Sequence, residues 1–258
     1  MRLILGAGYV GARVARLAMS RDEEALCVVR SWARAAELER EGLRVVCIDV
    51  QDAARRYARD GVHAIVCFPP DGTTDAALAP WLAAASHVSY VSSTSVYDAF
   101  VGPVNDETPV SALTSARLGA EAAYRAVNGV VLRAPGIYGP DRGMHVRVRS
   151  GQHQLPGAAE NYVSRIHVDD LAALLLASNK VRNACFVVGD AEPARQCDVV
   201  AWICKEYRCA PPPSVAAESV HASLRGNRLV DGSRALRDLG VQLKYPSYRD
   251  GMARTSDD

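Results

Sequence analysis

The sequence predicts an α/β fold, a Rossmann-like doubly wound parallel sheet followed by a small C-terminal lobe. Short apolar runs alternate with segments of helical periodicity through the first half of the 258 residues. The first run leads directly into a glycine-rich turn at Gly6. After Pro135 the alternation stops, and Gly, Pro, Arg and His become frequent. Strands that alternate with helices form parallel sheets with right-handed crossovers.

The predicted elements follow in order along the chain. Strands are expected at Leu3–Leu5, Leu26–Val29, Leu43–Ile48, His63–Phe68, Val88–Ser92 and Val130–Arg133. Helices are expected from Val10 to Ala18 and at Ala33–Glu41, Ala53–Arg59, Thr74–Ala85 and Ser111–Val127. Beyond an irregular stretch, Asp169–Asn179, Asp198–Tyr207 and Asp231–Leu239 are expected as helices and Cys185–Val188 as a strand. We therefore divide the chain into residues 1–135 and a lobe of residues 136–258, some of whose elements return to the sheet.

The glycine turn has a specific chemical meaning. Gly6 permits the tight turn, Gly8 lets the backbone approach a pyrophosphate, and Gly11 lets the helix pack close to the strand. The N–H groups and the dipole at the helix start favour phosphates. Because strand, turn and helix follow in this order, we predict that Gly6, Gly8, Tyr9, Val10 and Gly11 bind a dinucleotide. A tight turn in some other α/β protein is the alternative.

The second strand bears on which dinucleotide is bound. An acidic residue at its end holds the ribose of NAD, but here the strand ends in Arg30 and Ser31, with Arg34 one turn on. These residues suit a 2′-phosphate, so we expect NADP(H) in preference to NAD(H). A solvated basic helix start is the alternative. Asp49, at the end of the third strand, is either an acceptor for the adenine amino group or a helix N-cap.

Composition excludes several classes of protein. The 30 basic and 29 acidic residues leave a net charge of +1, which gives no case for binding nucleic acid or a membrane surface. No apolar run approaches the ~20 residues of a membrane span. The first strand starts at residue 2, so we expect no signal peptide and a cytoplasmic protein. The seven cysteines form no C-x-x-C pair. We expect free thiols, buried at Cys27, Cys47 and Cys67, and no metal site.

Five motifs from residue 91 onward carry a family resemblance. Val-Ser-Ser-Thr-Ser-Val-Tyr occupies 91–97, Asp-Glu-Thr-Pro occupies 106–109, and Leu-Arg-Ala-Pro-Gly-Ile-Tyr-Gly-Pro occupies 132–140. Arg-Ile-His-Val-Asp-Asp follows at 165–170, and Tyr-Pro-Ser-Tyr-Arg-Asp-Gly at 245–251. Together they resemble the extended short-chain dehydrogenases/reductases, the NAD(P)-dependent epimerase/dehydratase family. The last motif resembles a bacterial sugar-epimerase-like subgroup.

The resemblance implies further contacts and a partner. It places cofactor contacts at Val50, Phe68, Pro69, Pro70, Ser92, Pro135 and Ile137, with the nicotinamide near Pro135–Ile137. It implies a small-molecule substrate in the lobe. It also implies a homodimer through the helices at Thr74–Ala85 and Ser111–Val127.

The sequence departs from the family at the residues that move the proton. In the family a Ser or Thr holds the reacting oxygen, which Ser93 matches. A Tyr-x-x-x-Lys pair supplies the acid/base, and alignment on Glu121 places Leu113 and Arg117 at these positions. A positioned acid/base contributes ~10²–10⁴ in rate, and leucine has no proton to give. Arg117 is expected to hold the cofactor ribose but, as a permanent cation, is a poor base.

Two functions therefore stay open. One is an NADP(H)-dependent oxidoreductase or epimerase-like enzyme with a non-standard acid/base, in which Ser93, Tyr97 and Arg117 are the catalytic candidates. Other acid/base candidates are Tyr138, His145, His153, Tyr162 and His167. The second is a catalytically silent NADP(H)-binding sensor or scaffold. A cluster of Arg142, Arg147, Arg149 and Arg165 suggests an anionic substrate, with a solvated surface as the alternative.

Overall fold

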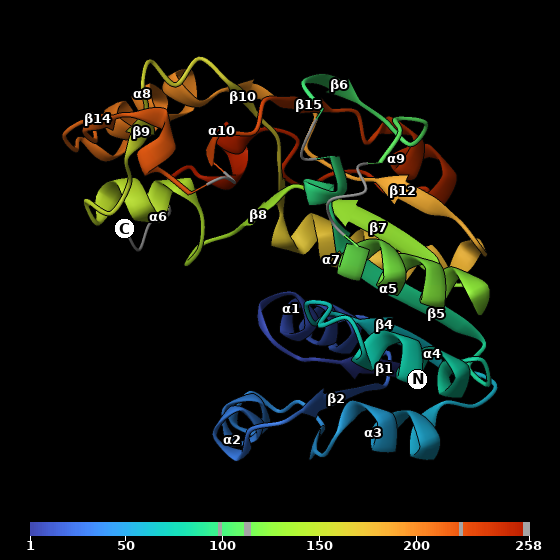
Figure 1. Cartoon of the computed structure of the whole chain (residues 1–258). Coiled ribbons are helices and arrows are strands. Elements are labelled where there is room, and N and C mark those ends of the chain that lie inside the picture. The colour runs from blue at the N-terminus through green and yellow to red at the C-terminus, as the bar shows by residue number, and fades with distance from the viewer. Residues whose placement is uncertain (98–99, 111–114, 222–223, 255–258) are drawn as a thin grey trace.

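A seven-stranded parallel sheet forms the centre of the computed structural model, which describes residues 1–97, 100–110, 115–221 and 224–254. The strand order is β12-β7-β5-β4-β1-β2-β3 (Figure 1). The strands are β1 (Arg2–Leu5), β2 (Ala25–Val29), β3 (Val45–Cys47), β4 (His63–Val66), β5 (His87–Ser93), β7 (Val130–Ala134) and β12 (Cys185–Val187). The predicted Rossmann-like fold is confirmed, with every predicted strand present and the third and fourth ones shorter than expected.

Helices cover both faces of the sheet. One face carries α1 (Tyr9–Met19), α2 (Trp32–Arg40), α7 (Val168–Ala177) and α9 (Ser233–Leu239). The other carries α3 (Val50–Tyr57), α4 (Thr74–Leu82) and α5 (Ser115–Ala126). Strand β1 is buried between the two layers, with Ile4 in one apolar cluster and Leu3 and Leu5 in the other. Successive side chains of a strand point to opposite faces, so a central strand must be apolar throughout.

The lobe leaves the sheet after β7 and returns to it through α7 and β12. Helices α6 (Met144–Arg149), α8 (Gln196–Tyr207) and α10 (Tyr248–Gly251) share a small core of their own. The short strands of the lobe, together with β6 from the segment after β5, pair in twos. They are β6 (Gly102–Val104), β8 (Gly136–Tyr138), β9 (Leu155–Pro156), β10 (Tyr162–Val163), β11 (Arg165–His167), β13 (Ala194–Arg195), β14 (Ser214–Val215) and β15 (Arg228–Val230). Helix α6 falls in the stretch expected to be irregular, because six residues are too few for a clear helical period.

The cysteines follow the expected pattern in part. The seven thiols are free, and Cys27 is fully buried in β2. Cys47 and Cys67 are only half-buried, because each lies at the carboxyl end of its strand rather than inside the sheet. None of the helices in the described part of the chain is long and apolar enough to cross a bilayer.

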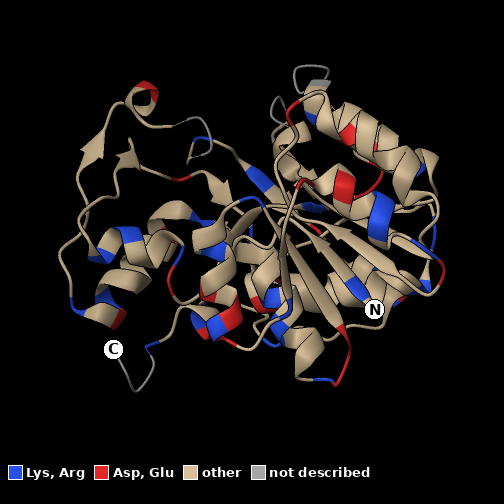
Figure 2. Cartoon of the chain, turned by 90° about the horizontal axis from the view of Figure 1, so that it is seen from below, with Lys and Arg blue, Asp and Glu red and all other residues tan. Residues whose placement is uncertain are grey.

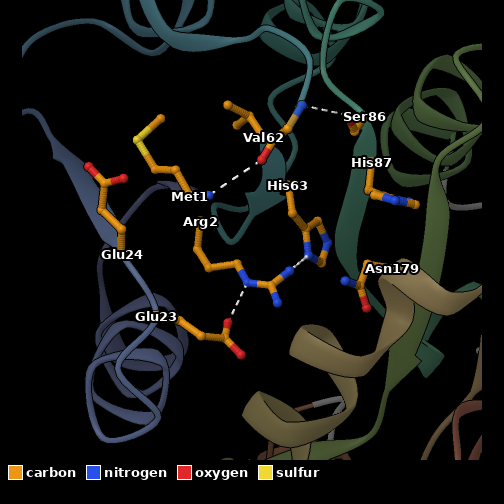
Figure 3. A pocket seen from close by; sticks show the side chains of 10 residues that line it. Met1, Arg2, Glu23, Glu24, Val62, His63, Ser86, His87 and Asn179 are labelled. Atoms are coloured by element: carbon orange, nitrogen blue, oxygen red, sulfur yellow. Dashed lines mark hydrogen bonds and ion pairs between the residues drawn. The ribbon is translucent and has the colours of Figure 1, made fainter.

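A buried histidine, His63, begins β4 at the amino ends of the strands, beside a cavity of about 440 Å³ (Figure 3). The His63 Nδ1 is 2.8 Å from an Arg2 guanidinium nitrogen, and its Nε2 is 2.7 Å from the Ser89 hydroxyl. Because arginine can only donate, Nδ1 accepts and Nε2 carries the proton. The Ser89 hydroxyl in turn lies 2.6 Å from that of Ser178. Burial, with a smaller contribution from Arg2, lowers the pKa of His63 to about 3.

Replacement of Gly11 by alanine is expected to destabilise the fold. A Cβ at this position would lie 2.6 Å from the Gly6 carbonyl oxygen and 3.0 Å from Ile4 Cγ2, so α1 would have to move away from β1. We expect a loss of about 1–3 kcal/mol in the free energy of unfolding. The matched control is Gly119→Ala in α5, where a Cβ meets nothing within 4 Å and a gain of about 0.5–1 kcal/mol is expected. Urea unfolding measures both variants. Equal changes in their free energies of unfolding would contradict the close packing of α1 on β1.

His63 should make stability depend on pH. Because the native pKa, about 3, lies below the unfolded value of 6.5, the unfolded chain binds the proton first. The stability contribution is therefore complete above pH 6.5 and is lost as pH falls. Between pH 7 and pH 5 this group alone should cost about 2 kcal/mol. His63→Gln should flatten the decline by that amount in urea unfolding at pH 7, 6 and 5, and parallel curves for the two proteins would refute it.

Candidate functional site

A cavity of about 1060 Å³ opens at the carboxyl ends of the strands, between the sheet and the lobe. The sheet side contributes the glycine turn at Gly8–Val10, the segment Cys67–Pro69 after β4, and the end of β5 at Val91–Ser95. Residues Ala134–Tyr138, which lead from β7 into the lobe, complete that wall. This is the crevice in which open α/β sheets bind their ligands.

The glycine turn has the geometry that its sequence predicts. Gly6 has a φ of +88°, a positive value that glycine adopts more readily than other residues do. Helix α1 then starts at Tyr9, and Gly8, Tyr9 and Val10 line the cavity. Gly6 and Gly11 are not among the lining residues and instead pack against each other inside the turn. The N-terminus of α1 is therefore presented to the cavity, as an anion site requires.

The structure distributes the other cofactor candidates unevenly. Phe68, Pro69, Ser92, Pro135 and Ile137 line the cavity. Val50 does not, because its side chain is buried in the apolar layer beneath α3. Pro70 is half-buried just beyond the lining residues. The two are thus set apart from the rest of the predicted set.

The residues after β2 and β3 serve mainly as helix caps. Ser31 caps α2 by accepting from the Arg34 N–H at 3.4 Å, and Asp49 caps α3 by accepting from the Gln51 N–H at 2.7 Å. The Arg34 Nε donates to the Ala7 carbonyl at 3.2 Å, which ties α2 to the glycine turn. Arg34 also pairs with Glu37 at 2.8 Å. Arg30 is exposed at the end of β2 and has no ion pair within the described residues.

A buried polar network lies behind the catalytic candidates. Glu121 of α5 and Arg133 of β7 form an ion pair at 2.6 Å, with side chains 5% and 11% exposed. The Ser92 hydroxyl donates to Glu121 at 2.5 Å, and Arg133 donates to the Tyr97 hydroxyl at 2.6 Å. The Ser93 hydroxyl, which lines the cavity, accepts from the Ser95 N–H at 3.1 Å. The network holds the end of β5 and thereby the position of Ser93.

Tyr97 is not available as an acid/base. Its side chain is fully buried among Val96, Val104 and Val187, outside the cavity lining. Its hydroxyl is committed to Arg133, and burial raises its pKa. We therefore correct the assignment of Tyr97 as a catalytic candidate. The reason is the helical turn at Thr94–Tyr97, which rotates Tyr97 away from Ser93.

Arg117 lines the cavity from α5, whereas Leu113 lies outside the described residues. Among the alternative acid/base residues, Tyr138 and Tyr162 also line it. Those two come from β8 and β10 of the lobe. The others, His145, His153 and His167, are buried elsewhere.

The charge of the cavity is entirely basic. Its described lining residues include no Asp, Glu or Lys, but they include six arginines, Arg117, Arg142, Arg147, Arg165, Arg225 and Arg228. Over the rest of the chain both signs are interspersed (Figure 2). Arg149, which we expected in the cluster, instead stacks on Tyr207 at 4.3 Å and is not among the lining residues. Arg225 and Arg228 were missed, because they follow the three-proline break and no motif marks them.

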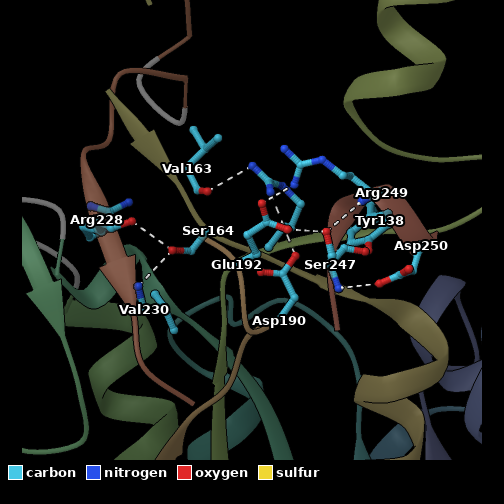
Figure 4. Close-up of polar contacts among 11 residues, drawn as sticks. Tyr138, Val163, Ser164, Asp190, Glu192, Arg228, Val230, Ser247, Arg249 and Asp250 are labelled. Atoms are coloured by element: carbon cyan, nitrogen blue, oxygen red, sulfur yellow. Dashed lines mark hydrogen bonds and ion pairs between the residues drawn. The ribbon is translucent and has the colours of Figure 1, made fainter. Parts of the chain in front are cut away.

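Arg165 is the most deeply buried of these arginines, and it contacts Val163 and Asp190, which Figure 4 labels. It is 4% exposed, and its Nη2 donates to the Val163 carbonyl at 3.0 Å. Its Nη1 lies 4.0 Å from Asp190, and the Tyr248 ring packs 4.9 Å from the guanidinium carbon. Burial raises the pKa of Asp190 to about 7 against the opposing effect of Arg165. The pair therefore keeps a positive charge whenever Asp190 is protonated.

The structure closely matches solved structures of other proteins. A functionally unknown conserved protein from Silicibacter pomeroyi is 28% identical and has a TM-score of 0.81, with 97% of this chain and 96% of that one covered. A Methylobacillus flagellatus protein assigned by name to the NAD-dependent epimerases/dehydratases is 26% identical, with a TM-score of 0.75 and coverages of 97% and 95%. The sequence matches no protein-family model and no curated protein.

An enzyme of known reaction shares the fold at lower identity. UDP-glucuronic acid 4-epimerase from Bacillus cereus, solved with UDP-glucuronic acid and NAD, is 15% identical. Its TM-score is 0.77, with 98% of this chain and 96% of that chain covered. The chain thus has the fold of the extended short-chain dehydrogenases/reductases, and it stands structurally among NAD-dependent epimerase/dehydratase-like proteins.

Removal of Glu121 is expected to be strongly destabilising. Glu121→Ala leaves the Arg133 charge buried without its partner, which typically costs about 3–5 kcal/mol. Glu37→Ala, which breaks the exposed pair with Arg34, should cost under about 1 kcal/mol. Guanidinium unfolding of the two variants measures the difference. Similar losses in both would mean that the buried pair does not hold α5 to the sheet.

Proposed function

We propose that this chain is an NADP(H)-dependent oxidoreductase or epimerase-like enzyme that acts on a small anionic substrate. The observation that carries the proposal is the composition of the large cavity. One wall is the glycine turn with Ser93 and Pro135–Ile137, and the rest carries arginine but no Asp, Glu or Lys among the described lining residues. A dinucleotide site and an anion site would therefore share one cavity, as an enzyme that brings cofactor and substrate together requires.

The cofactor half of the proposal is supported by the turn and by the structural neighbours. The Bacillus cereus enzyme, which shares the fold, was solved with NAD. The preference for NADP(H) is supported by the exposed Arg30 at the carboxyl end of β2. A planar guanidinium there can donate two hydrogen bonds to a 2′-phosphate.

The anionic substrate is supported by the arrangement of the arginines. Burial and the nearby positive charge of Arg142 both lower the pKa of Arg147. An anion bound beside Arg147 relieves this repulsion. Arg165 offers a buried guanidinium in the same cavity. Carboxylate and phosphate groups match this donor pattern best.

The chemistry proposed for this chain divides between two of its residues. A bound nicotinamide would supply or accept the hydride. The Ser93 hydroxyl donates a hydrogen bond to the reacting oxygen of the substrate and so orients it. Arg117 supplies a fixed positive charge where the family has lysine. The proton is then exchanged with a substrate group or with water, because Arg117 is a poor base.

A homodimer is part of the proposal. Helices α4 and α5 pack side by side on one face of the sheet (Figure 1), and Trp81 of α4 is 45% exposed beneath the Arg55 guanidinium. A second copy would cover this aromatic side chain. Light scattering distinguishes the dimer from a monomer.

Turnover assays test the enzymatic function. The purified protein is incubated with NADPH and a panel of carboxylated and phosphorylated carbonyl compounds and nucleotide sugars, and with NADP⁺ and the matching alcohols. We expect a change in absorbance at the nicotinamide band with at least one anionic substrate and a strong loss in Ser93→Ala. Tight NADPH binding without turnover across the panel would instead support the sensor or scaffold. Activity that appears only in the double variant Leu113→Tyr with Arg117→Lys would also favour a sensor or scaffold over an enzyme.

Arg30 should discriminate between the two cofactors. Arg30→Ala removes donors to the 2′-phosphate, so we expect NADP⁺ to bind about 10–100-fold more weakly while NAD⁺ binding stays the same. The matched control is Arg40→Ala at the far end of α2, where the Nε donates to the Ala36 carbonyl. Calorimetric titration with both cofactors measures the effect. An equal loss for NAD⁺ and NADP⁺ would remove Arg30 from the 2′-phosphate site.

A further inference from the structure

A tight turn of the lobe lies directly on the glycine turn. The Gly139 N–H donates to the Arg142 carbonyl at 2.8 Å, and the Arg142 N–H donates back to the Gly139 carbonyl at 3.1 Å. A Cβ at Gly139 would overlap the Tyr9 hydroxyl oxygen and lie 2.8 Å from Val168 Cγ1. Glycine at this position therefore lets the lobe touch the first residue of α1.

The turn brings one arginine above Tyr9. The guanidinium carbon of Arg142 lies 5.1 Å from the centre of the Tyr9 ring. The Tyr9 hydroxyl is buried, and burial together with the adjacent Asp141 raises its pKa. The Tyr9 side chain is therefore an uncharged aromatic surface beneath Arg142. An arginine on an aromatic face keeps its edges free to donate in the plane of the guanidinium.

Arg142 lies on the side of the expected pyrophosphate site that the N-terminus of α1 does not contact. The N-terminus of α1 contacts a pyrophosphate from one side, and the oxygens on the other side face the cavity. Arg142 lines that cavity together with Gly8 and Tyr9, although it comes from the lobe. The neighbouring Arg147 and Arg165 follow later in the lobe, on α6 and β11.

We propose that Arg142, contributed by the lobe and packed over the Tyr9 ring, is a cofactor-binding residue that donates to the pyrophosphate of the bound dinucleotide. The inference rests on the dinucleotide binding proposed above. It separates Arg142, which binds the cofactor, from Arg147 and Arg165, which stay available for the substrate. The Gly139–Arg142 turn joins β8 to α6, so a cofactor bound to Arg142 would contact both the sheet and the lobe. Substrate should therefore bind after the cofactor.

Calorimetric titration of three proteins tests this role. NAD⁺, NADP⁺ and adenosine 2′-monophosphate, which lacks the pyrophosphate, are titrated into wild type, Arg142→Gln and Arg149→Gln. Arg149 is the matched control, since it also stacks on a tyrosine but lies outside the cavity lining. We expect Arg142→Gln to weaken both dinucleotides by the same factor of about 10–100. Adenosine 2′-monophosphate should bind as it does to wild type, and Arg149→Gln should change nothing.

Two further variants separate contact from folding. Arg142→Lys keeps the charge without the planar fork and should recover part of the affinity, whereas Tyr9→Phe keeps the aromatic surface and should bind normally. Unchanged dinucleotide affinity in Arg142→Gln would overturn the inference while leaving the proposed cofactor intact. An equal loss of adenosine 2′-monophosphate would overturn it as well. Wild type that binds neither dinucleotide would overturn both the inference and the proposed function.

Discussion

The buried ion pair between Glu121 and Arg133 is the interaction on which the candidate site depends. It joins α5 to β7, and through Ser92 and Tyr97 it also ties down the end of β5. Ser93 and Arg117 lie on elements that this network connects. Two buried charges are expensive to desolvate, so each must remain paired and hydrogen-bonded for the fold to persist. The site thus has a rigid rear wall whose own charges are neutralised before any ligand arrives.

The front of the site is assembled from distant parts of the chain. Strand β12 returns to the sheet beside β7, and α7 packs on α1. This return places the lobe over the carboxyl ends of the strands, and it brings Arg165 of β11 and Arg228 of β15 to the same cavity as the glycine turn. Because no acidic side chain lines the described part of that cavity, its positive charge is left for ligands. Behind the cavity, Arg133 is paired with Glu121, and among the arginines that line it Arg165 lies 4.0 Å from Asp190.

How far the sequence predicts the site depends on how local each feature is. The glycine turn was predicted residue by residue, because Gly6 and Gly11 act on backbone geometry within a few positions. The cap at Asp49, one of the two roles expected of it, is local in the same way, whereas the cap at Ser31 was not among the expectations. The assignment of Tyr97 as a catalytic candidate was wrong, because its distance from Ser93 along the chain does not reveal the helical turn at Thr94–Tyr97 that buries its side chain. Arg149 and Arg142 looked alike in the sequence, and only the packing of α6 against α8 and of the turn against α1 separates them.

The sequence by itself determined the Rossmann-like sheet, the position of the glycine turn, and the presence of Leu113 and Arg117 where the family that it resembles has Tyr and Lys. These follow from periodicity, backbone requirements and residue identity, which are properties of short segments. Only the tertiary structure decided which arginines share a cavity, that Tyr97 is sealed behind Arg133, and that Gly139 brings Arg142 onto Tyr9. Each of these is a contact between residues far apart in the chain, and the path of the lobe back to the sheet sets those contacts.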